Sequence, residues 1–139
     1  MVTRRMVLTA APLVALSTAG CGVSSEQSRD FSMMAQAEID KDPSVASGEI
    51  SVVCKDYLFY AYNNIQGSIE ISPDVLLNPQ IILLNVVKNC ITVLVRSGAL
   101  SEGQVDVTGT AGNVKVTLYQ ALDAPQDKPL TIKEIMSWS

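Results

Sequence analysis

The 139-residue sequence contains no histidine. Histidine is the commonest general base and the commonest transition-metal ligand. A His-dependent catalytic triad is therefore excluded, and zinc would need a site built from cysteine and carboxylates alone. Three cysteines are too few for a structural zinc site. We accordingly expect neither a metal nor a cofactor.

Basic residues are also scarce, with ten Lys and Arg against fourteen Asp and Glu. Nucleic-acid binding needs a basic patch, and no basic cluster is present, so the composition argues against a nucleic-acid partner. A Gly-rich phosphate loop, an EF-hand, a Ser-x-x-Lys motif and a distinctive carboxylate pair are all missing from the sequence. The sequence therefore favours a protein that is not an enzyme.

The N-terminal segment has the parts of an export signal. Arg4 and Arg5 precede an apolar run from Met6 to Leu16, and small residues follow. This run is shorter than the ~20 residues of a membrane span. Residues 3–8, TRRMVL, resemble a twin-arginine export signal, a resemblance weakened by Val7 in place of the usual Phe. The general secretory route is the alternative.

Residues 18–21, TAGC, resemble a bacterial lipobox, in which the cysteine is acylated and becomes the first mature residue. The resemblance implies a membrane anchor through lipid on Cys21, and Gly22 after it favours the outer membrane. Ordinary cleavage near Ala19, with Cys21 left as a thiol, is the alternative. We therefore expect an export signal over 1–20, a lipidated cysteine and short tether over 21–29, and one globular domain over 30–139.

The patterns of the mature chain predict a mainly α (α+β) fold. Pro43 and Pro79 each follow a capping residue, which predicts two long central helices over 43–63 and 79–97. Three shorter helices are also predicted, over 30–41, over 73–77 and after the capping box that begins at Thr131. The alternating stretches 105–108 and 114–119 predict a C-terminal β-hairpin with a five-residue loop, although the second stretch also fits a helix.

Cys54 and Cys90 are the two cysteines beyond the anchor. An even pair in an oxidising compartment predicts one disulfide, and antiparallel long helices would bring the middles of the two helices together. Two buried free thiols are the alternative, because cysteine is often buried.

Two groups of residues are candidate binding sites. Phe59 and Tyr62 would form an aromatic patch for a protein partner on a face of the first long helix. Asn85, Asn89 and Arg96 would lie on one polar stripe of the second helix and could bind a polar ligand or a peptide. The plainer interpretations are a helix that packs on two sides and a solvated strip on a buried helix.

The leading functional hypothesis is a membrane-tethered lipoprotein on the periplasmic or outer face of a bacterial membrane. It would act as a non-catalytic assembly, docking or inhibitor subunit for an envelope protein. The alternatives are a periplasmic module that binds a small polar ligand or peptide, and a His-independent hydrolase that uses Ser, Lys or carboxylates.

Overall fold

The computed structural model describes residues 19–56, 61–75, 78–99 and 102–138. In chain order the elements are α2 (Ala19–Asp40), β1 (Val45–Asp56), β2 (Ala61–Ile71), α3 (Pro79–Arg96), β3 (Gln104–Ala111), β4 (Val114–Thr117), α4 (Leu118–Leu122), β5 (Leu130–Thr131) and α5 (Ile132–Ser137).

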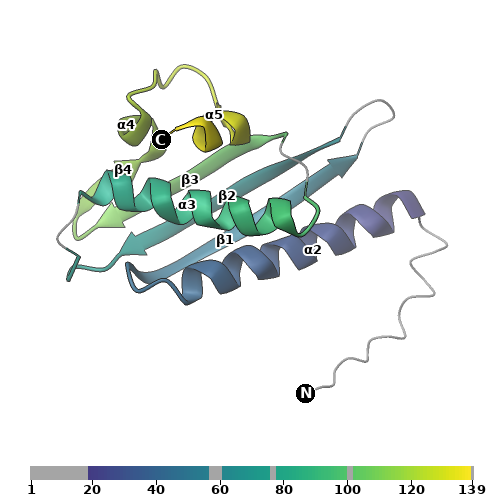
Figure 1. Ribbon diagram of the computed structural model, residues 1–139, viewed down its shortest axis with the longest axis horizontal. Helices are drawn as coiled ribbons and strands as arrows, with labels where there is room; N and C mark the ends of the chain where they lie inside the picture. Colours follow the sequence, from purple (N-terminus) through teal and green to yellow (C-terminus); the bar gives the residue numbers. More distant parts are fainter. Residues whose placement is uncertain (1–18, 57–60, 76–77, 100–101, 139) are drawn as a thin grey trace.

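The five strands form one mixed sheet in the order β1-β2-β3-β4, with β5 also paired to β3. β1 and β2 are antiparallel, and so are β3 and β4. β2 and β3 are parallel and are joined by α3, which crosses the sheet between them (Figure 1). A parallel pair needs such a crossover because a short turn cannot return the chain to the same end of the sheet.

The helices of the described chain lie on one side of this sheet. α3 runs across it, α2 lies along the β1 side, and α4 and α5 contact α3 near the chain's end (Figure 1). Side chains alternate along the strands between buried and exposed positions, as period-2 geometry requires. The buried set faces the helices and consists of Ile50, Val52, Cys54, Asn63, Ile65, Ile69, Ile71, Val105, Val107, Gly109 and Val116.

Glycines in the strands permit close packing, as Gly109 and Gly67 show. A Cβ on Gly109 would lie 3.3 Å from a methyl group of Leu83, so the missing side chain lets α3 approach the sheet. A Cβ on Gly67 would overlap the carbonyl oxygen of Glu49 and lie 2.9 Å from Cα of Ile50. The β1–β2 pair is therefore closed so tightly at this point that only glycine fits.

The expectation of a mainly α fold is wrong, because the described residues of the predicted helix over 43–63 form a turn, β1 and the start of β2. Asp42 does not cap a helix there. Its carboxylate accepts from the Ser44 N–H at 2.9 Å, and its carbonyl accepts from Val45 N–H at 3.1 Å, which makes a turn into the strand. The buried apolar residues of β1 then alternate, at Ile50, Val52 and Cys54. Val53 lies between two of them and is also apolar, so the two-residue period of a strand is hard to recognise in the sequence.

Three predicted elements are confirmed. α3 begins at Pro79, with Asn78 Oδ1 accepting from the Gln80 N–H. The C-terminal hairpin is present as β3 and β4, although Ala111 pairs with Val114 and leaves a loop of two residues, and the chain turns helical at Leu118. α5 follows the capping box that begins at Thr131.

The other two short helices differ from expectation. α2 covers the predicted helix over 30–41 but begins much earlier, at Ala19, so the residues expected to form a tether are helical. Of the predicted helix over 73–77, residues 73–75 are described and form a turn rather than a helix.

The predicted disulfide is also wrong. Cys54 lies on β1 and Cys90 on α3, and both are buried free thiols. The expected pairing depended on two antiparallel helices, and Cys54 does not lie on a helix. The Cys90 thiol instead contacts the carbonyl oxygen of Ala35 in α2, at 3.7 Å.

Among the described residues, α3 is the one helix whose length and composition would also suit a membrane span. Eight of its side chains are buried in the domain. The helix of a soluble core passes the same test, so its apolar character is accounted for by packing against the sheet.

The buried Cys90 thiol should make the fold sensitive to alkali. Burial raises the pKa of Cys90 to about 12 from an ordinary value of 9.0, and the nearby carboxylates of Glu38 and Asp42 add to the increase. The unfolded chain loses this proton first, so the free energy of unfolding should fall as the pH rises from about 9 towards 12. Urea unfolding at a series of pH values measures the slope.

The Cys90→Ala chain lacks this proton and should show a shallower fall over the same pH range. Equal slopes in the two chains would contradict the assignment of the alkaline loss to Cys90.

Candidate functional site

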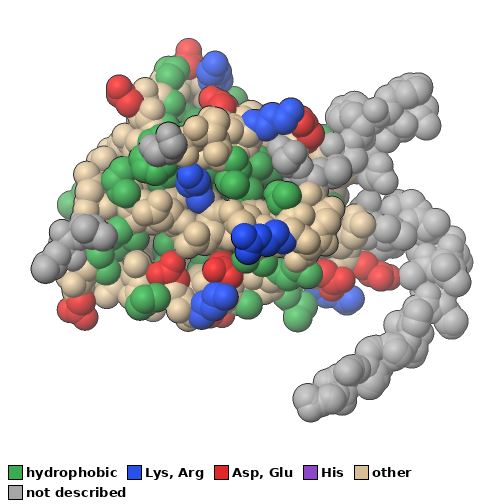
Figure 2. Space-filling view, viewed as in Figure 1, with side chains coloured by type: hydrophobic (Ala, Val, Ile, Leu, Met, Phe, Trp, Pro, Cys, Tyr) green, Lys and Arg blue, Asp and Glu red, His purple; other side chains and the backbone are tan. Residues whose placement is uncertain are grey.

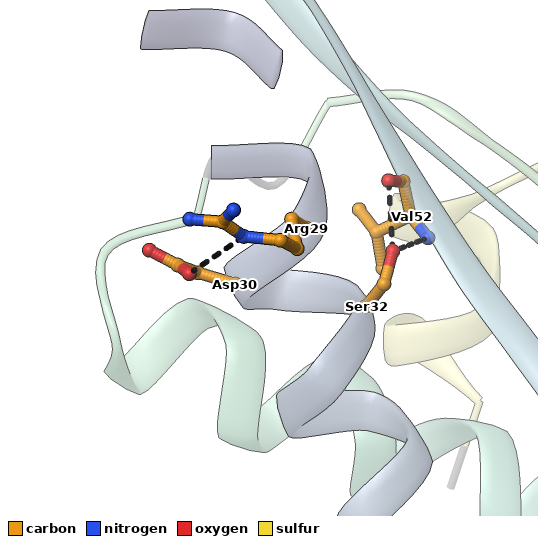
Figure 3. A network of polar contacts seen from close by, with 4 residues as sticks. All are labelled: Arg29, Asp30, Ser32 and Val52. Carbon is orange, nitrogen blue, oxygen red and sulfur yellow. Dashed lines mark hydrogen bonds and ion pairs between the residues drawn. The ribbon is translucent and has the colours of Figure 1, made fainter. Parts of the chain in front are cut away.

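α2 closes the outer edge of β1 with polar side chains. Ser32 Oγ accepts from the Val52 N–H at 2.7 Å and donates to the Val52 carbonyl at 3.1 Å (Figure 3). In the same view Arg29 and Asp30 point away from the strand. The Ser32 hydroxyl thus satisfies both backbone groups of one edge residue.

The same contact repeats one helical turn away in each direction. Gln36 accepts from the Ile50 N–H at 3.1 Å and donates to the Gly48 carbonyl at 2.9 Å. Ser28 Oγ accepts from the Cys54 N–H at 2.8 Å. We call Ser28, Ser32 and Gln36 the edge ladder. It supplies five hydrogen bonds to backbone groups that a neighbouring strand would otherwise fill.

The side of the sheet away from the helices is polar and accessible. We call it the open face. Its residues come from four strands and are exposed or half-buried: Glu49, Ser51, Val53, Lys55, Tyr62, Asn64, Gln66, Ser68, Glu70, Gln104, Asp106, Thr108, Thr110, Lys115 and Thr117. Most carry a hydroxyl or an amide, which can both donate and accept hydrogen bonds.

An open groove of about 740 Å³ lies over β1 and β2. Glu49, Ser51, Gln66 and Ser68 line it, and Gln36 of the edge ladder reaches it from α2. The closely packed backbone at Gly67 forms part of its floor. The groove therefore offers neutral hydrogen-bonding groups and one carboxylate.

A second hollow of about 360 Å³ lies where the chain after α4 passes β3. Gln104, Asp106, Gln126 and Lys128 line it together with Tyr119, whose hydroxyl donates to the Lys128 carbonyl at 3.0 Å. Tyr119 therefore holds the loop in place there.

The opposite side of the domain carries the polar stripe of α3. Asn85, Asn89 and Arg96 are exposed on this helix, and neither groove includes them. Ligand binding by these three residues stays a prediction. Lys88 has an internal role: its amine donates to the Trp138 carbonyl at 2.7 Å and lies 5.3 Å from the centre of the indole ring. Figure 2 shows this side, with acidic and basic side chains interspersed.

Tyr62, the described residue of the predicted aromatic patch, does not lie on a helix. Tyr62 is half-buried on β2, where it pairs with Lys55 of β1 and belongs to the open face. Phe59 lies outside the described residues. For Tyr62 the expectation of a helix face is therefore wrong, and partner binding through Phe59 and Tyr62 stays a prediction.

The two buried thiols are poor nucleophiles. Burial also raises the pKa of Cys54, against a hydrogen bond from Ser28 that lowers it. A thiol is reactive as the thiolate, so both cysteines are held in the unreactive form. Within the part of the chain that is described, no group of three or more His, Cys, Asp or Glu side chains could hold a metal ion.

The residues of the predicted export signal, Arg4 and Arg5, lie outside the described part of the chain. The backbone of Cys21 lies in the first turns of α2. Lipidation of Cys21 stays a prediction.

Comparisons with models of protein families, with curated proteins and with solved structures gave no match.

The edge ladder and the open face were missed by the sequence reasoning. The ladder had a signal, since Ser28, Ser32 and Gln36 recur every four residues beside the apolar residues Phe31 and Ala35. The open face has no usable signal, because the sequence pattern places its residues on a predicted helix or in separate segments.

Loss of a ladder hydroxyl should destabilise the domain. Ser32→Ala leaves the N–H and carbonyl of Val52 without the Ser32 partner, and an unsatisfied buried polar group costs about 1–3 kcal/mol. We expect the free energy of unfolding, measured with urea, to fall by roughly that amount. Met33→Ala on the exposed side of α2 is the control and should change it by less than about 0.5 kcal/mol. Equal effects of the two substitutions would contradict the role of the ladder.

Proposed function

We propose that this chain is a lipid-anchored protein of the bacterial envelope and acts as a non-catalytic docking subunit whose contact surface is the open face. The observation that carries the proposal is the one-sided architecture. The described helices cover one side of a five-stranded sheet, and the other side presents four strands of polar side chains.

The chemistry of the open face suits a protein partner. Interfaces between proteins that also exist apart have a polar composition close to that of an ordinary surface, with about one hydrogen bond per 100–200 Å². Hydroxyls and amides of Ser51, Gln66 and Ser68 can supply such bonds around the groove. Tyr62 adds an aromatic side chain, a type enriched at the centres of interfaces.

The position of α2 supports an anchor at one end of the domain. Cys21 precedes Ser28 by seven residues of continuous helix, a rise of about 10 Å. Ser28 bonds to Cys54 near the end of β1. A lipid on Cys21 would therefore hold the domain at the end where β1 finishes and β2 and β3 begin, with no flexible tether between lipid and domain.

The buried groups support a non-catalytic role. The Cys54 and Cys90 thiols, both buried, are kept protonated, and the sequence has no histidine to act as a base at neutral pH. The groove over β1 and β2 contains a single carboxylate, that of Glu49, and no basic side chain.

Docking through the open face predicts a one-sided crosslinking pattern. A photo-crosslinking amino acid placed at Gln66, in the groove, should capture a stoichiometric envelope protein in intact cells. The same amino acid at Asn85, on the exposed side of α3, is the matched control and should capture none. Gel shifts and mass spectrometry of the products measure both.

The reverse pattern, with capture at Asn85 alone, would overturn docking by the open face and support binding at the α3 stripe. Capture at neither position would overturn the docking function.

A lipid anchor predicts a specific mass and location. The mature chain extracted in detergent should begin at an acylated Cys21 and should fractionate with membranes. Cys21→Ser removes the acceptor sulfur, so its product should lose the lipid mass and leave the membrane fraction. An unmodified thiol at residue 21 in the extracted chain would contradict the anchor.

A further inference from the structure

We propose that the outer edge of β1 is a masked surface for pairing with β1 of a second copy of this chain, and that the edge ladder is what masks it. This proposal rests on the ladder contacts and the charges on β1. It does not depend on the docking function or on the lipid anchor.

β1 is an edge strand of the sheet, and its backbone could pair with another strand. It is 12 residues long, and its even-numbered residues direct hydrogen-bonding groups to the side away from β2. Such an edge is a template for another strand unless something covers it. Here the cover is a set of side chains on α2 rather than a strand.

Apart from the ladder, α2 is held by apolar packing against β1 and α3. α2 places three fully or nearly fully buried side chains in the core, those of Phe31, Ala35 and Ile39. Its sequence includes two glycines and four serines among the poorer helix formers. Tertiary contacts with β1 and α3 therefore hold α2, while the ladder side chains alone occupy the hydrogen-bonding groups of the edge, so loss of the ladder should leave these groups open to a second strand.

The charges on β1 select the partner and the register. Antiparallel pairing of two β1 strands about Val52 places Glu49 of each copy opposite Lys55 of the other. It also pairs the Val52 N–H and carbonyl, which Ser32 now occupies, with those of the second Val52. Both charged residues are exposed on the open face. Opposite charges on directly facing residues stabilise a strand pair.

Neighbouring registers lack this match. Centring the pair on Ile50 or Ser51 places both Glu49 and Lys55 opposite uncharged residues of β1. A two-fold pairing about Val52 therefore brings two ion pairs together at once. This self-complementarity is what a symmetric dimer requires.

The test compares oligomeric state by sedimentation velocity in four versions of the full chain. The unaltered chain and the control Arg29→Ala/Met33→Ala should be monomers, because these two residues lie outside the ladder. The ladder variant Ser32→Ala/Gln36→Ala should dimerise at least about tenfold more tightly. Adding Lys55→Glu to it should weaken the dimer about fivefold, since each Glu49 then faces a glutamate.

The charge swap decides the register. Glu49→Lys together with Lys55→Glu, in the ladder variant, restores opposite charges and should restore the dimer. A ladder variant that stays monomeric would overturn the proposal. A dimer whose affinity does not change when the charges at residues 49 and 55 are changed would overturn it as well. If circular dichroism shows that the double variant is unfolded, the single variant Gln36→Ala is used in its place. It loses the hydrogen bonds to Ile50 and Gly48, and it must dimerise more tightly than the unaltered chain and respond to the same charge changes.

Discussion

The contact on which the domain depends is the match between one turn of α2 and two residues of β1. Four residues of helix rise about 6 Å, and two residues of strand advance about 6.6 Å. Side chains at every fourth helical position can therefore reach every second backbone group of an antiparallel strand. Ser28, Ser32 and Gln36 do so at Cys54, Val52 and Ile50. A helix thereby takes the place of a sixth strand, and the long edge of the sheet is closed without another strand.

The parts of the fold that the sequence could predict are those that local chemistry determines. α3 has its cap and proline, α5 its capping box, and the β3–β4 hairpin its alternation and glycine turn, and each needs no distant partner. β1 could not be predicted in this way. Its Asp42-Pro43-Ser44 start fits a helix cap or a turn equally well, and Val52 and Val53 together hide the alternation. Only the pairing with β2 and the cover by α2 make a strand the better state, and these are long-range contacts.

The same reason explains what was missed at the candidate site. The exposed positions of Asn85, Asn89 and Arg96 were predictable because they depend on the period of one helix. The groove over β1 and β2 joins Glu49 to Gln66, and the register between two strands brings them together. With 43–63 taken as a helix, that register did not exist. The one-sided sheet then gives the domain two different surfaces, a helical side with scattered charge and a sheet side rich in hydroxyls and amides.

Hydrogen exchange of the β1 amides reports directly on whether α2 closes the edge of the sheet. If α2 closes the edge, the N–H groups of Ile50, Val52 and Cys54, which face α2, should exchange as slowly as those of Ser51 and Val53, which face β2. Residue-resolved exchange by NMR can compare the two sets within one strand. If only Ser51 and Val53 exchange slowly, while Ile50, Val52 and Cys54 exchange like unprotected amides, the edge of β1 is open. That result would contradict the role of α2.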